Sequence, residues 1–294
     1  MASILRSVGA GIQTPAVGAM FPQLVPKDSL TRFQGINQTI GSVSLLLSPA
    51  VGGAVLGSFG IEWTFLLDAV TALLAIGVMS RIRTGKIERR GEPSSVVSEL
   101  AQGIRYTFSH PQLKRIVICY ACSFFLITPA AVLTPLLVER SFGSDVWLLT
   151  ANEMVWTVGA LAGGLFVSLR KDFKDKVRTA ALCLLGFGVT FALLGVARPF
   201  WIYLVVMGMA GFFMPVIATS QTVFIQEITE PSVLGRVFSI VQIISAGSMP
   251  AAILLFGPLA DIVSVEAILI VTGILLALVG LWYQHGNKPS AKFS

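Results

Sequence analysis

Long apolar runs separated by short polar stretches are the dominant pattern along this chain. Nine runs of about 20 or more mostly apolar residues follow one another, and about 20 is the length a helix needs to cross the hydrocarbon core of a bilayer. They are approximately Ile4–Val25, Phe33–Phe59, Thr64–Ile82, Ile116–Val138, Val146–Leu169, Val177–Ala197, Pro199–Ile225, Val237–Ala260 and Ile262–Tyr283. Within lipid only helices or closed barrels satisfy the backbone, and these runs are too long and too evenly apolar for barrel strands. The pattern predicts an all-α polytopic membrane protein with nine transmembrane helices.

Basic residues are distributed unequally over the loops between these runs. The chain carries 21 Lys and Arg against 15 Asp and Glu, which gives a formal net charge of +6. All but three of the basic residues (Arg6, Arg140 and Arg198) fall on the side that includes the long polar segment 83–115. Cytoplasmic loops of membrane proteins are rich in Lys and Arg, so this segment and the C-terminus are predicted to be cytoplasmic. Topology and contact with anionic lipids then account for the basic character, and we expect no nucleic-acid partner.

Sequence motifs for catalysis and metal binding do not stand out. Cys119 and Cys122 have the spacing of a zinc-binding pair, but no second pair or nearby histidine completes a site. The sequence has no GxxxxGKS or GxxxxGKT loop for ATP and no HExxH motif. We therefore expect no metal, no cofactor and no enzymatic activity, and an ATP-driven exporter is disfavoured.

The first three runs resemble the last three. Aligning Arg32 with Arg236 also places Gln38 opposite Gln242 and Gly53 opposite Gly257. In both copies an arginine opens a span rich in glycine and proline, and an acidic residue precedes the final apolar run. Parallel repeats related by an axis along the membrane normal are a known transporter arrangement. The repeat predicts a parent of two six-helix halves, of which this chain holds the last nine helices.

Four stretches carry a family resemblance. They are LSPAVGG (Leu47–Gly53), ELAQGIRYTFSHPQLKR (Glu99–Arg115), IQEITEPSVLGRVFSI (Ile225–Ile240) and FGPLADIVSVEAILI (Phe256–Ile270). The chain resembles the major facilitator superfamily, in its macrolide-efflux-like drug exporter branch, over its whole length. The resemblance implies a major facilitator-like helical bundle equivalent to helices four to twelve of a twelve-helix parent. The signature loop between family helices two and three would be absent.

The resemblance also implies an organisation and a function. Residues 1–82 would form part of a first half, 83–115 a cytoplasmic central loop, 116–285 a six-helix second half and 286–294 a cytoplasmic tail. The expected function is secondary active transport, by this chain or by a larger protein of which it is a piece. It would export hydrophobic small molecules or drugs from a bacterial cell by alternating access and proton antiport, within the plasma membrane. A non-transporting membrane remnant is the first alternative, and an intramembrane enzyme is a more distant one.

Two of the 15 acidic residues lie clearly within apolar runs. Acids inside a membrane are costly and often mark ion pathways and proton relays. Glu153, which has Asn152 beside it, is the first candidate for proton coupling or substrate contact, and Asp68 is the second. The alternative for Glu153 is a structural acid that faces a neighbouring backbone. Asp68 falls on a peripheral helix of the family, where packing near the outer surface is the simpler interpretation.

Other polar and small residues inside the spans are candidates for substrate contact or helix packing. By the resemblance, Gln13, Thr128 and Gln221 fall on helices that line the central cavity of the family, and these three residues together with Asn152 are the candidates for substrate contact. Pro49, Gly52, Gly53 and Gly57 match the helix-packing and gating motif of superfamily exporters, and ordinary packing between helices explains them equally well. Gly159 and Gly163 repeat the same spacing in the fifth span.

Two further features belong to the predicted cytoplasmic side. Arg32 and Arg236 each open a span, either as charged anchors or as a gate that pairs with an acid such as Asp28, Glu227 or Glu230. The segment Val96–Phe108 is amphipathic at helical spacing, so it is predicted to lie at the membrane surface rather than to span it.

Overall fold

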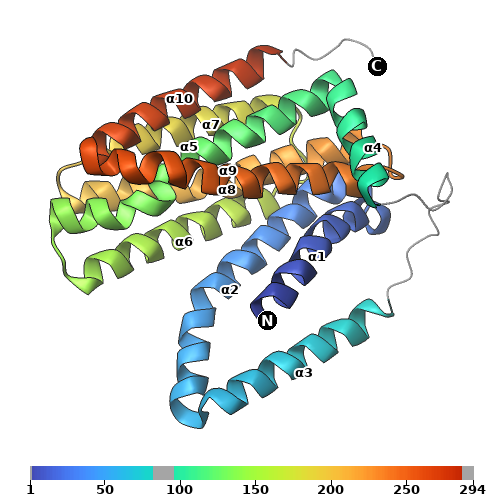
Figure 1. The fold of residues 1–294 in the computed structure, drawn as a ribbon, viewed down its shortest axis with the longest axis horizontal. Helices are drawn as coiled ribbons and strands as arrows, with labels where there is room; N and C mark the ends of the chain where they lie inside the picture. Colours follow the sequence, from blue (N-terminus) through green and yellow to red (C-terminus); the bar gives the residue numbers. More distant parts are fainter. Residues whose placement is uncertain (1, 82–95, 287–294) are drawn as a thin grey trace.

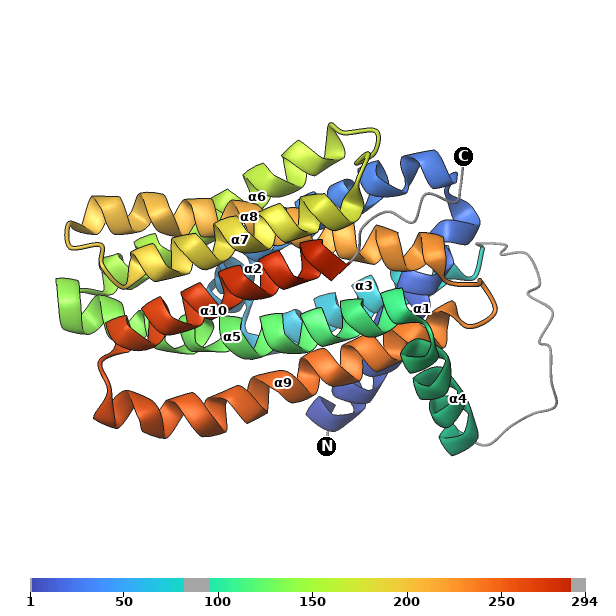
Figure 2. The ribbon, with the colours of Figure 1, turned by 90° about the horizontal axis from the view of Figure 1, so that it is seen from above.

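The computed structural model describes residues 2–81 and 96–286, and every regular element in these ranges is helical (Figure 1). The helices are α1 (Ala2–Leu24), the short 3-10 helix η1 (Lys27–Ser29), α2 (Leu30–Phe59), α3 (Ile61–Met79), α4 (Val96–Ser109), α5 (Pro111–Phe142), α6 (Val146–Ser168), α7 (Lys176–Leu194), α8 (Phe200–Ile228), α9 (Leu234–Ile262) and α10 (Val265–Gly286). Helices α5 to α10 run along the bundle, and α4 crosses one of its ends (Figures 1 and 2).

Each of the nine apolar runs forms a helix, which confirms the predicted fold class. Seven stretches of the described chain are long and apolar enough to cross a membrane by length and composition alone. The helices α1 and α6 fall short by this measure although each has 23 residues. Polar side chains lower their hydropathy: α6 carries Asn152 and Glu153 side by side, and α1 carries Gln13 and Thr14. Of the predicted central loop 83–115, residues 83–95 lie outside the described residues, and most of the remainder forms α4.

Helices α5 to α10 share one large hydrophobic core. Its fully buried side chains include Leu184, Phe187 and Phe191 from α7 and Leu269 and Leu276 from α10. At about 25 cal/mol for each Å² of apolar surface removed from contact with solvent in soluble proteins, such burial would dominate stability. In lipid the gain comes instead from close packing of the same side chains. This core holds the six-helix part of the chain together.

Glycines bring the backbones of α6 and α8 into contact. A Cβ atom added to Gly163 would overlap the carbonyl oxygen of Phe212, and one added to Gly211 would overlap that of Trp156. Gly159 meets the carbonyl of Gly208 in the same way. The spacing of Gly159 and Gly163 places both on one face of α6, where small residues allow helices to approach closely in membranes.

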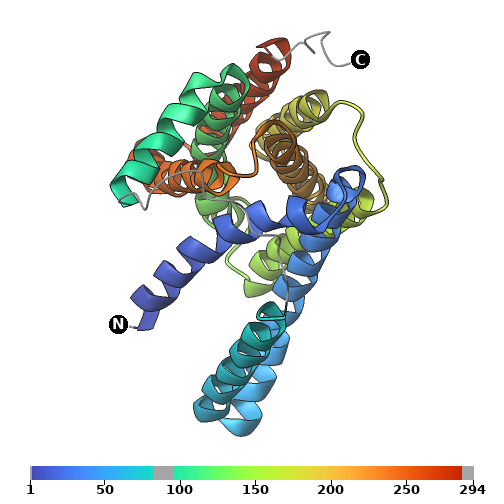
Figure 3. The same cartoon turned by 90° about the vertical axis from the view of Figure 1, so that its right-hand side faces the viewer.

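Helices α1 to α3 join the rest of the molecule at one end only. The buried residues of α2 are Leu30, Thr31, Gln34, Gly35 and Ser42, and none of its residues beyond Ser42 is buried. The outer part of α2 and the whole of α3 extend away from the other helices as a hairpin (Figures 1 and 3). The hairpin turns at Gly60, whose φ of +84° is a conformation that glycine adopts without strain.

The predicted packing motif lies on this extended part of α2. A Cβ atom added to Gly52, Gly53 or Gly57 would meet nothing within 4 Å among the described residues. Where α2 and α6 approach each other, the glycines in close contact are Gly35, against the backbone of Ser168, and Gly164, against Thr39. A packing or gating role for Pro49 and its neighbouring glycines therefore stays a prediction.

Candidate functional site

Glu153 faces a small, mostly apolar cavity inside the bundle. Glu153 lies about 10 Å along α6 from the start of that helix at Val146, at 1.5 Å per residue. The cavity has a volume of about 170 Å³. Its other lining residues are Ile127, Ala130, Ala131 and Thr134 of α5, Trp156 of α6, Phe191 of α7 and Met207 of α8. Glu153 is exposed as a residue, and it is the one acidic side chain among those that line this cavity.

A chain of two hydrogen bonds, buried at Tyr203 and Asn152, leads to the Glu153 side chain. The Nδ2 atom of Asn152 donates to Oε1 of Glu153 at 3.3 Å, and the Tyr203 hydroxyl donates to Oδ1 of Asn152 at 3.0 Å. Asn152 is 1% exposed and Tyr203 is fully buried. Because the Tyr203 hydroxyl occupies the amide oxygen, the amide nitrogen is directed to the carboxylate. Asn152, predicted as a cavity residue, thus positions Glu153, and Tyr203 completes the chain of hydrogen bonds.

The other predicted substrate contacts are separate from this cavity. Gln13 is exposed on α1. Thr128 is buried and its hydroxyl donates to the carbonyl oxygen of Phe124 at 2.7 Å. Gln221 is buried and donates to Sγ of Cys119 at 3.4 Å. None of the three lines the Glu153 cavity as the described residues define it, so their contact with substrate stays a prediction.

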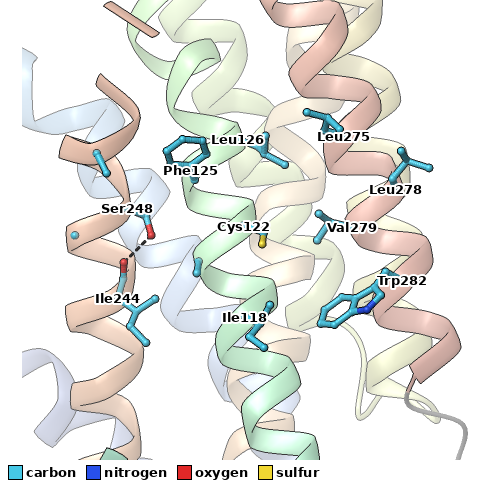
Figure 4. Close-up of a pocket in the computed structure, with 13 residues that line it drawn as sticks. Ile118, Cys122, Phe125, Leu126, Ile244, Ser248, Leu275, Leu278, Val279 and Trp282 are labelled. Atoms are coloured by element: carbon cyan, nitrogen blue, oxygen red, sulfur yellow. Dashed lines mark hydrogen bonds between the residues drawn. The ribbon is translucent and has the colours of Figure 1, made fainter. Parts of the chain in front are cut away.

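A larger apolar cavity of about 840 Å³, wide open at the surface of the bundle, lies against α5, between α9 and α10 (Figure 4). In Figure 4, Ile118, Cys122, Phe125 and Leu126 of α5 lie between side chains of the two other helices. Those are Ile244 and Ser248 of α9 and Leu275, Leu278, Val279 and Trp282 of α10. The Ser248 hydroxyl donates to the carbonyl oxygen of Ile244 at 2.7 Å, so its proton is already used. This cavity therefore offers an apolar surface to a ligand.

A cluster of charged residues joins four elements at the end of the bundle where most basic residues gather. The Nζ atom of Lys176, at the start of α7, lies 2.9 Å from Oδ2 of Asp172 and 3.0 Å from Oε1 of Glu227 at the end of α8. The hydroxyl of Thr31, on α2, donates to Oδ1 of Asp172 at 2.6 Å. Lys176 is only 9% exposed, so its charge is compensated where water is scarce. The cluster fastens α2 to the loop between α6 and α7.

The protonation of Asp172 responds to these contacts. Partial burial alone would raise the pKa of this carboxyl. Hydrogen bonds from Thr31 and Lys176 and the charge of Lys176 favour the ionised form and outweigh burial, so the pKa of Asp172 lies below its ordinary value of 3.8. Asp172 is therefore ionised at neutral pH and accepts both hydrogen bonds.

The two predicted gate residues each lie in the first turn of a helix, as expected, but the structure describes other contacts for them than the sequence suggested. Arg32 is exposed at the start of α2. Arg236 lies 3.7 Å from Glu99 of α4, between Nη2 and Oε1, and its Nη1 donates to Oε1 of Gln102 at 3.2 Å. Glu227, considered as a partner of these arginines, pairs with Lys176 instead. The gate role of Arg32 and Arg236 stays a prediction.

Sequence reasoning missed Lys176, Asp172 and Thr31 as a unit. A local signal was present, because Asp172 and Lys176 are only four residues apart, on either side of the start of α7. The partners Thr31 and Glu227 are distant in the chain, and the Thr31–Asp172 contact spans 141 residues. Asp68, the second candidate for proton coupling, is exposed on α3.

The chain is similar in sequence to a family of membrane transporters and to named efflux proteins. The sequence profile of a family described as transmembrane secretion effector matches residues 1–292. Macrolide efflux protein A of Streptococcus pyogenes is 26% identical over 281 residues, which cover 94% of this chain and 69% of that protein. The multidrug efflux pump Tap of Mycolicibacterium fortuitum is 22% identical over 290 residues, which cover 95% of this chain and 70% of that protein. The chain thus spans about 70% of the length of these relatives.

Solved structures share the fold at low sequence identity. The fucose:proton symporter of E. coli superposes with a TM-score of 0.71 at 11% identity, covering 93% of this chain and 73% of that one. A bacterial homologue of the iron transporter ferroportin, in an outward-facing state, gives a TM-score of 0.70 at 16% identity, covering 95% and 70%. The profile match over nearly the whole chain decides the assignment. The chain belongs to the transmembrane secretion effector family of the major facilitator superfamily, a family of membrane transporters and not of enzymes.

Proposed function

We propose that this protein exports hydrophobic small molecules of the macrolide or multidrug kind and that proton uptake at Glu153 drives the export. The substrate class is taken from the relatives, which are named as macrolide and multidrug efflux proteins. The apolar cavity between α5, α9 and α10 is consistent with it, because its lining would favour a ligand with a large apolar surface. The bacterial plasma membrane is the proposed location.

The proposal rests on the position and the contacts of Glu153. It is an ionisable residue on a helix of the bundle, it lines a cavity, and it accepts a hydrogen bond from Asn152, which the buried Tyr203 hydroxyl orients. Intramembrane acids with these features serve as proton carriers in transporters because protonation removes a charge that lipid and apolar residues do not favour. A proton taken up from the outer side would neutralise Glu153, and its release on the inner side would restore the charge.

The contacts at the basic end support alternating access. At that end, the Lys176 cluster and the contact of α2 with α6 hold helices α1 to α3 against helices α5 to α10. At the other end, the hairpin of α2 and α3 diverges from them. We propose that residues 1–82 and 116–285 belong to two halves that move relative to each other, with 83–115 as the connection and 286–294 as a tail. The basic end would be the cytoplasmic side, by the distribution of Lys and Arg.

Proteoliposomes test the role of Glu153. The purified protein is reconstituted with an acidic interior, and uptake of a radiolabelled macrolide and the internal pH are followed together. For the unmodified protein we expect uptake accompanied by a rise in internal pH. For Glu153→Gln, which keeps size and hydrogen bonding but cannot titrate, we expect macrolide binding without pH-driven uptake.

Two variants serve as comparisons. Glu139→Gln changes an exposed acid at the end of α5 and is expected to transport like the unmodified protein. Asp68→Asn tests the second coupling candidate and is expected to keep coupling. If Glu153→Gln still moves protons with the macrolide, Glu153 is a structural acid. If the unmodified protein binds the macrolide but never transports it, the non-transporting alternative is correct.

A further inference from the structure

The Tyr203 hydroxyl makes one hydrogen bond within the part of the chain that the structure describes. Tyr203 lies in the first turn of α8, is fully buried, and donates to Oδ1 of Asn152 at 3.0 Å. If this hydroxyl accepted a hydrogen bond from the amide instead, its own proton would be left without a partner in an apolar setting, which is costly. The hydroxyl therefore acts as the donor, and the amide nitrogen of Asn152 is left to face Glu153.

An aromatic cluster holds the Tyr203 ring at the end of the bundle opposite the basic end. The ring of Phe142, the last residue of α5, lies 5.3 Å from that of Tyr203 between centroids, and Phe200 stacks on Tyr203 at 6.1 Å. Phe142 and Phe200 are 5.1 Å apart, and Trp147, near the start of α6, meets Phe200 edge to face at 5.5 Å. The cluster of Phe142, Trp147, Phe200 and Tyr203 joins the ends of three helices, so the position of the Tyr203 hydroxyl depends on how these ends pack.

The direction of the Asn152 amide decides which form of Glu153 it favours. An amide N–H can donate to a carboxylate, whereas an amide oxygen can only accept and so pairs with a protonated carboxyl. In the arrangement described here, Nδ2 faces Oε1 of Glu153 at 3.3 Å, which favours the ionised form. Once the Tyr203 hydroxyl is withdrawn, the amide is free to turn its oxygen to Glu153, and the protonated form is favoured instead.

No other ionisable side chain among the described residues lines the Glu153 cavity. Its walls are formed by Ile127, Ala130, Ala131, Thr134, Trp156, Phe191 and Met207. The charged residues at the ends of α5, α6 and α8 nearest the aromatic cluster are all exposed, and they are Glu139, Arg140, Asp145 and Arg198. The Asn152 amide is thus the polar side-chain contact of the Glu153 carboxylate that the structure describes, and the Tyr203 hydroxyl controls it.

We propose that Tyr203 is a positioning residue that links the protonation of Glu153 to the packing of the aromatic cluster. While the cluster is closed, the hydroxyl keeps Asn152 donating to Glu153, and the acid releases its proton readily. When the ends of α5 and α8 move and withdraw the hydroxyl, Glu153 takes up a proton more readily. Such a link is reciprocal, so protonation of Glu153 favours the loosened cluster. The inference rests on the proposed role of Glu153 in proton coupling and adds the contact through which conformation and protonation depend on each other.

Infrared titration of the purified protein in detergent tests this link without transport. The band of the protonated Glu153 carboxyl is identified as the carboxylic acid absorption that Glu153→Gln lacks, and it is followed against pH. Tyr203→Phe keeps the ring with its aromatic contacts and loses only the hydroxyl. We expect the Glu153 band of this variant to persist to a pH higher by roughly half a unit to one unit, the size that one hydrogen bond to a carboxylate supports.

Tyr283→Phe is the matched control. It also removes a buried hydroxyl, but one that makes no hydrogen bond among the described residues, so the Glu153 band is expected to titrate as in the unmodified protein. In an Asn152→Ala background, adding Tyr203→Phe is expected to change nothing, because the hydroxyl acts through the amide. An undiminished shift in that background would overturn the proposal, since Tyr203 would then act on Glu153 by another route.

Loosening the aromatic cluster tests the dependence on packing. Phe142→Leu removes a ring from the cluster and keeps most of the side-chain volume. We expect it to move the Glu153 band to higher pH in the same direction as Tyr203→Phe, by a smaller amount, and to add nothing when the two changes are combined. Melting of each variant establishes that the fold is retained. A folded Phe142→Leu variant that titrates like the unmodified protein would refute the link between packing and protonation.

The outcomes separate this inference from the proposed function. In proteoliposomes we expect the pH profile of macrolide uptake by Tyr203→Phe to move to higher pH together with the Glu153 band, with macrolide binding unchanged. Equal titration of Tyr203→Phe and the unmodified protein would refute the positioning role even where Glu153→Gln abolishes pH-driven uptake. A shifted titration together with proton-coupled transport by Glu153→Gln would uphold the positioning role and refute the proposed function.

Discussion

At the scale of single residues, Lys176 takes part in two of the ion pairs that the structure describes. Its ammonium group forms ion pairs with both Asp172 and Glu227, and Asp172 also accepts a hydrogen bond from the Thr31 hydroxyl. Replacing Lys176 by Met would leave two carboxylates close together without a cation. Breaking a fully buried pair costs about 3–5 kcal/mol, but both acids here are partly exposed, so a smaller cost of about 1–2 kcal/mol is expected.

The measurement for Lys176→Met is thermal melting in detergent. We expect the melting temperature to fall by several degrees, since about 1 kcal/mol corresponds to roughly 2–4 °C for proteins of 150–250 residues. Lys174→Met removes an exposed cation from the same loop and is expected to melt like the unmodified protein. Equal melting of both variants would mean that the cluster does not stabilise the closed end.

Asp172 gives the cluster a pH dependence of defined sign. Its pKa is lower in the folded protein than the ordinary value of 3.8, so its stabilising contribution is complete above that value. The contribution is lost as the pH falls through the lowered pKa. We expect Asp172→Asn to melt below the unmodified protein at pH 6, and the difference to shrink as the pH falls below 3.8. A difference that stays constant down to pH 3 would contradict this assignment.

The candidate site could be predicted from the sequence only in part. Glu153 stood out because an acid inside an apolar run is rare and costly. The chain of hydrogen bonds that leads to it could not be foreseen, because Tyr203 approaches Asn152 only when α6 and α8 pack together. Lys176 was counted among the loop charges for the same reason: its partner Glu227 ends a different helix. Local spacing identifies single residues, whereas their partners depend on tertiary packing.

At the scale of elements, the sequence predicted the helices well and their contacts poorly. The run Val146–Leu169 predicts α6 within a residue, and Val96–Phe108 predicts α4 within a residue, because apolar periodicity and polar interruptions mark helix ends directly. The glycines were harder to distinguish. Gly53 and Gly163 have similar sequence surroundings, yet only Gly163 meets another backbone among the described residues. Which face of a helix finds a neighbour depends on the whole arrangement.

The contact between α6 and α8 makes a testable prediction. In Gly163→Leu the new side chain would meet the carbonyl of Phe212, and because a backbone atom cannot move aside, the helices must separate. Overpacking costs about 1–3 kcal/mol even among flexible side chains, so this variant is expected to lose at least that much stability. Melting in detergent compares it with Gly77→Leu on α3, where an added Cβ atom meets nothing. Equal melting of the two variants would show that the close approach is not required.

At the scale of the whole molecule, the distribution of charge predicts which end faces the cytoplasm. Lys174, in the loop between α6 and α7, and Ser144, between α5 and α6, are exposed at opposite ends of the bundle. We expect a membrane-impermeant thiol reagent, applied to intact cells, to label Ser144→Cys and to leave Lys174→Cys unlabelled. Disruption of the cells should expose Lys174→Cys to the reagent. Labelling of Lys174→Cys in intact cells would reverse the orientation.

The glycine contacts of α6 also determine how this helix could move relative to its neighbours. Gly159 and Gly163 place the backbone of α6 directly against that of α8 over more than one turn. Because no flexible side chain separates the two backbones, α6 and α8 are expected to move as one rigid unit. Against α2, the close approach is confined to Gly35 and Gly164, near the basic end. If α6 and α8 move together against α2, the close contact of Gly35 and Gly164 would be the point about which they turn. Small rearrangements at the Lys176 cluster would then be amplified into large displacements at the far ends of the helices.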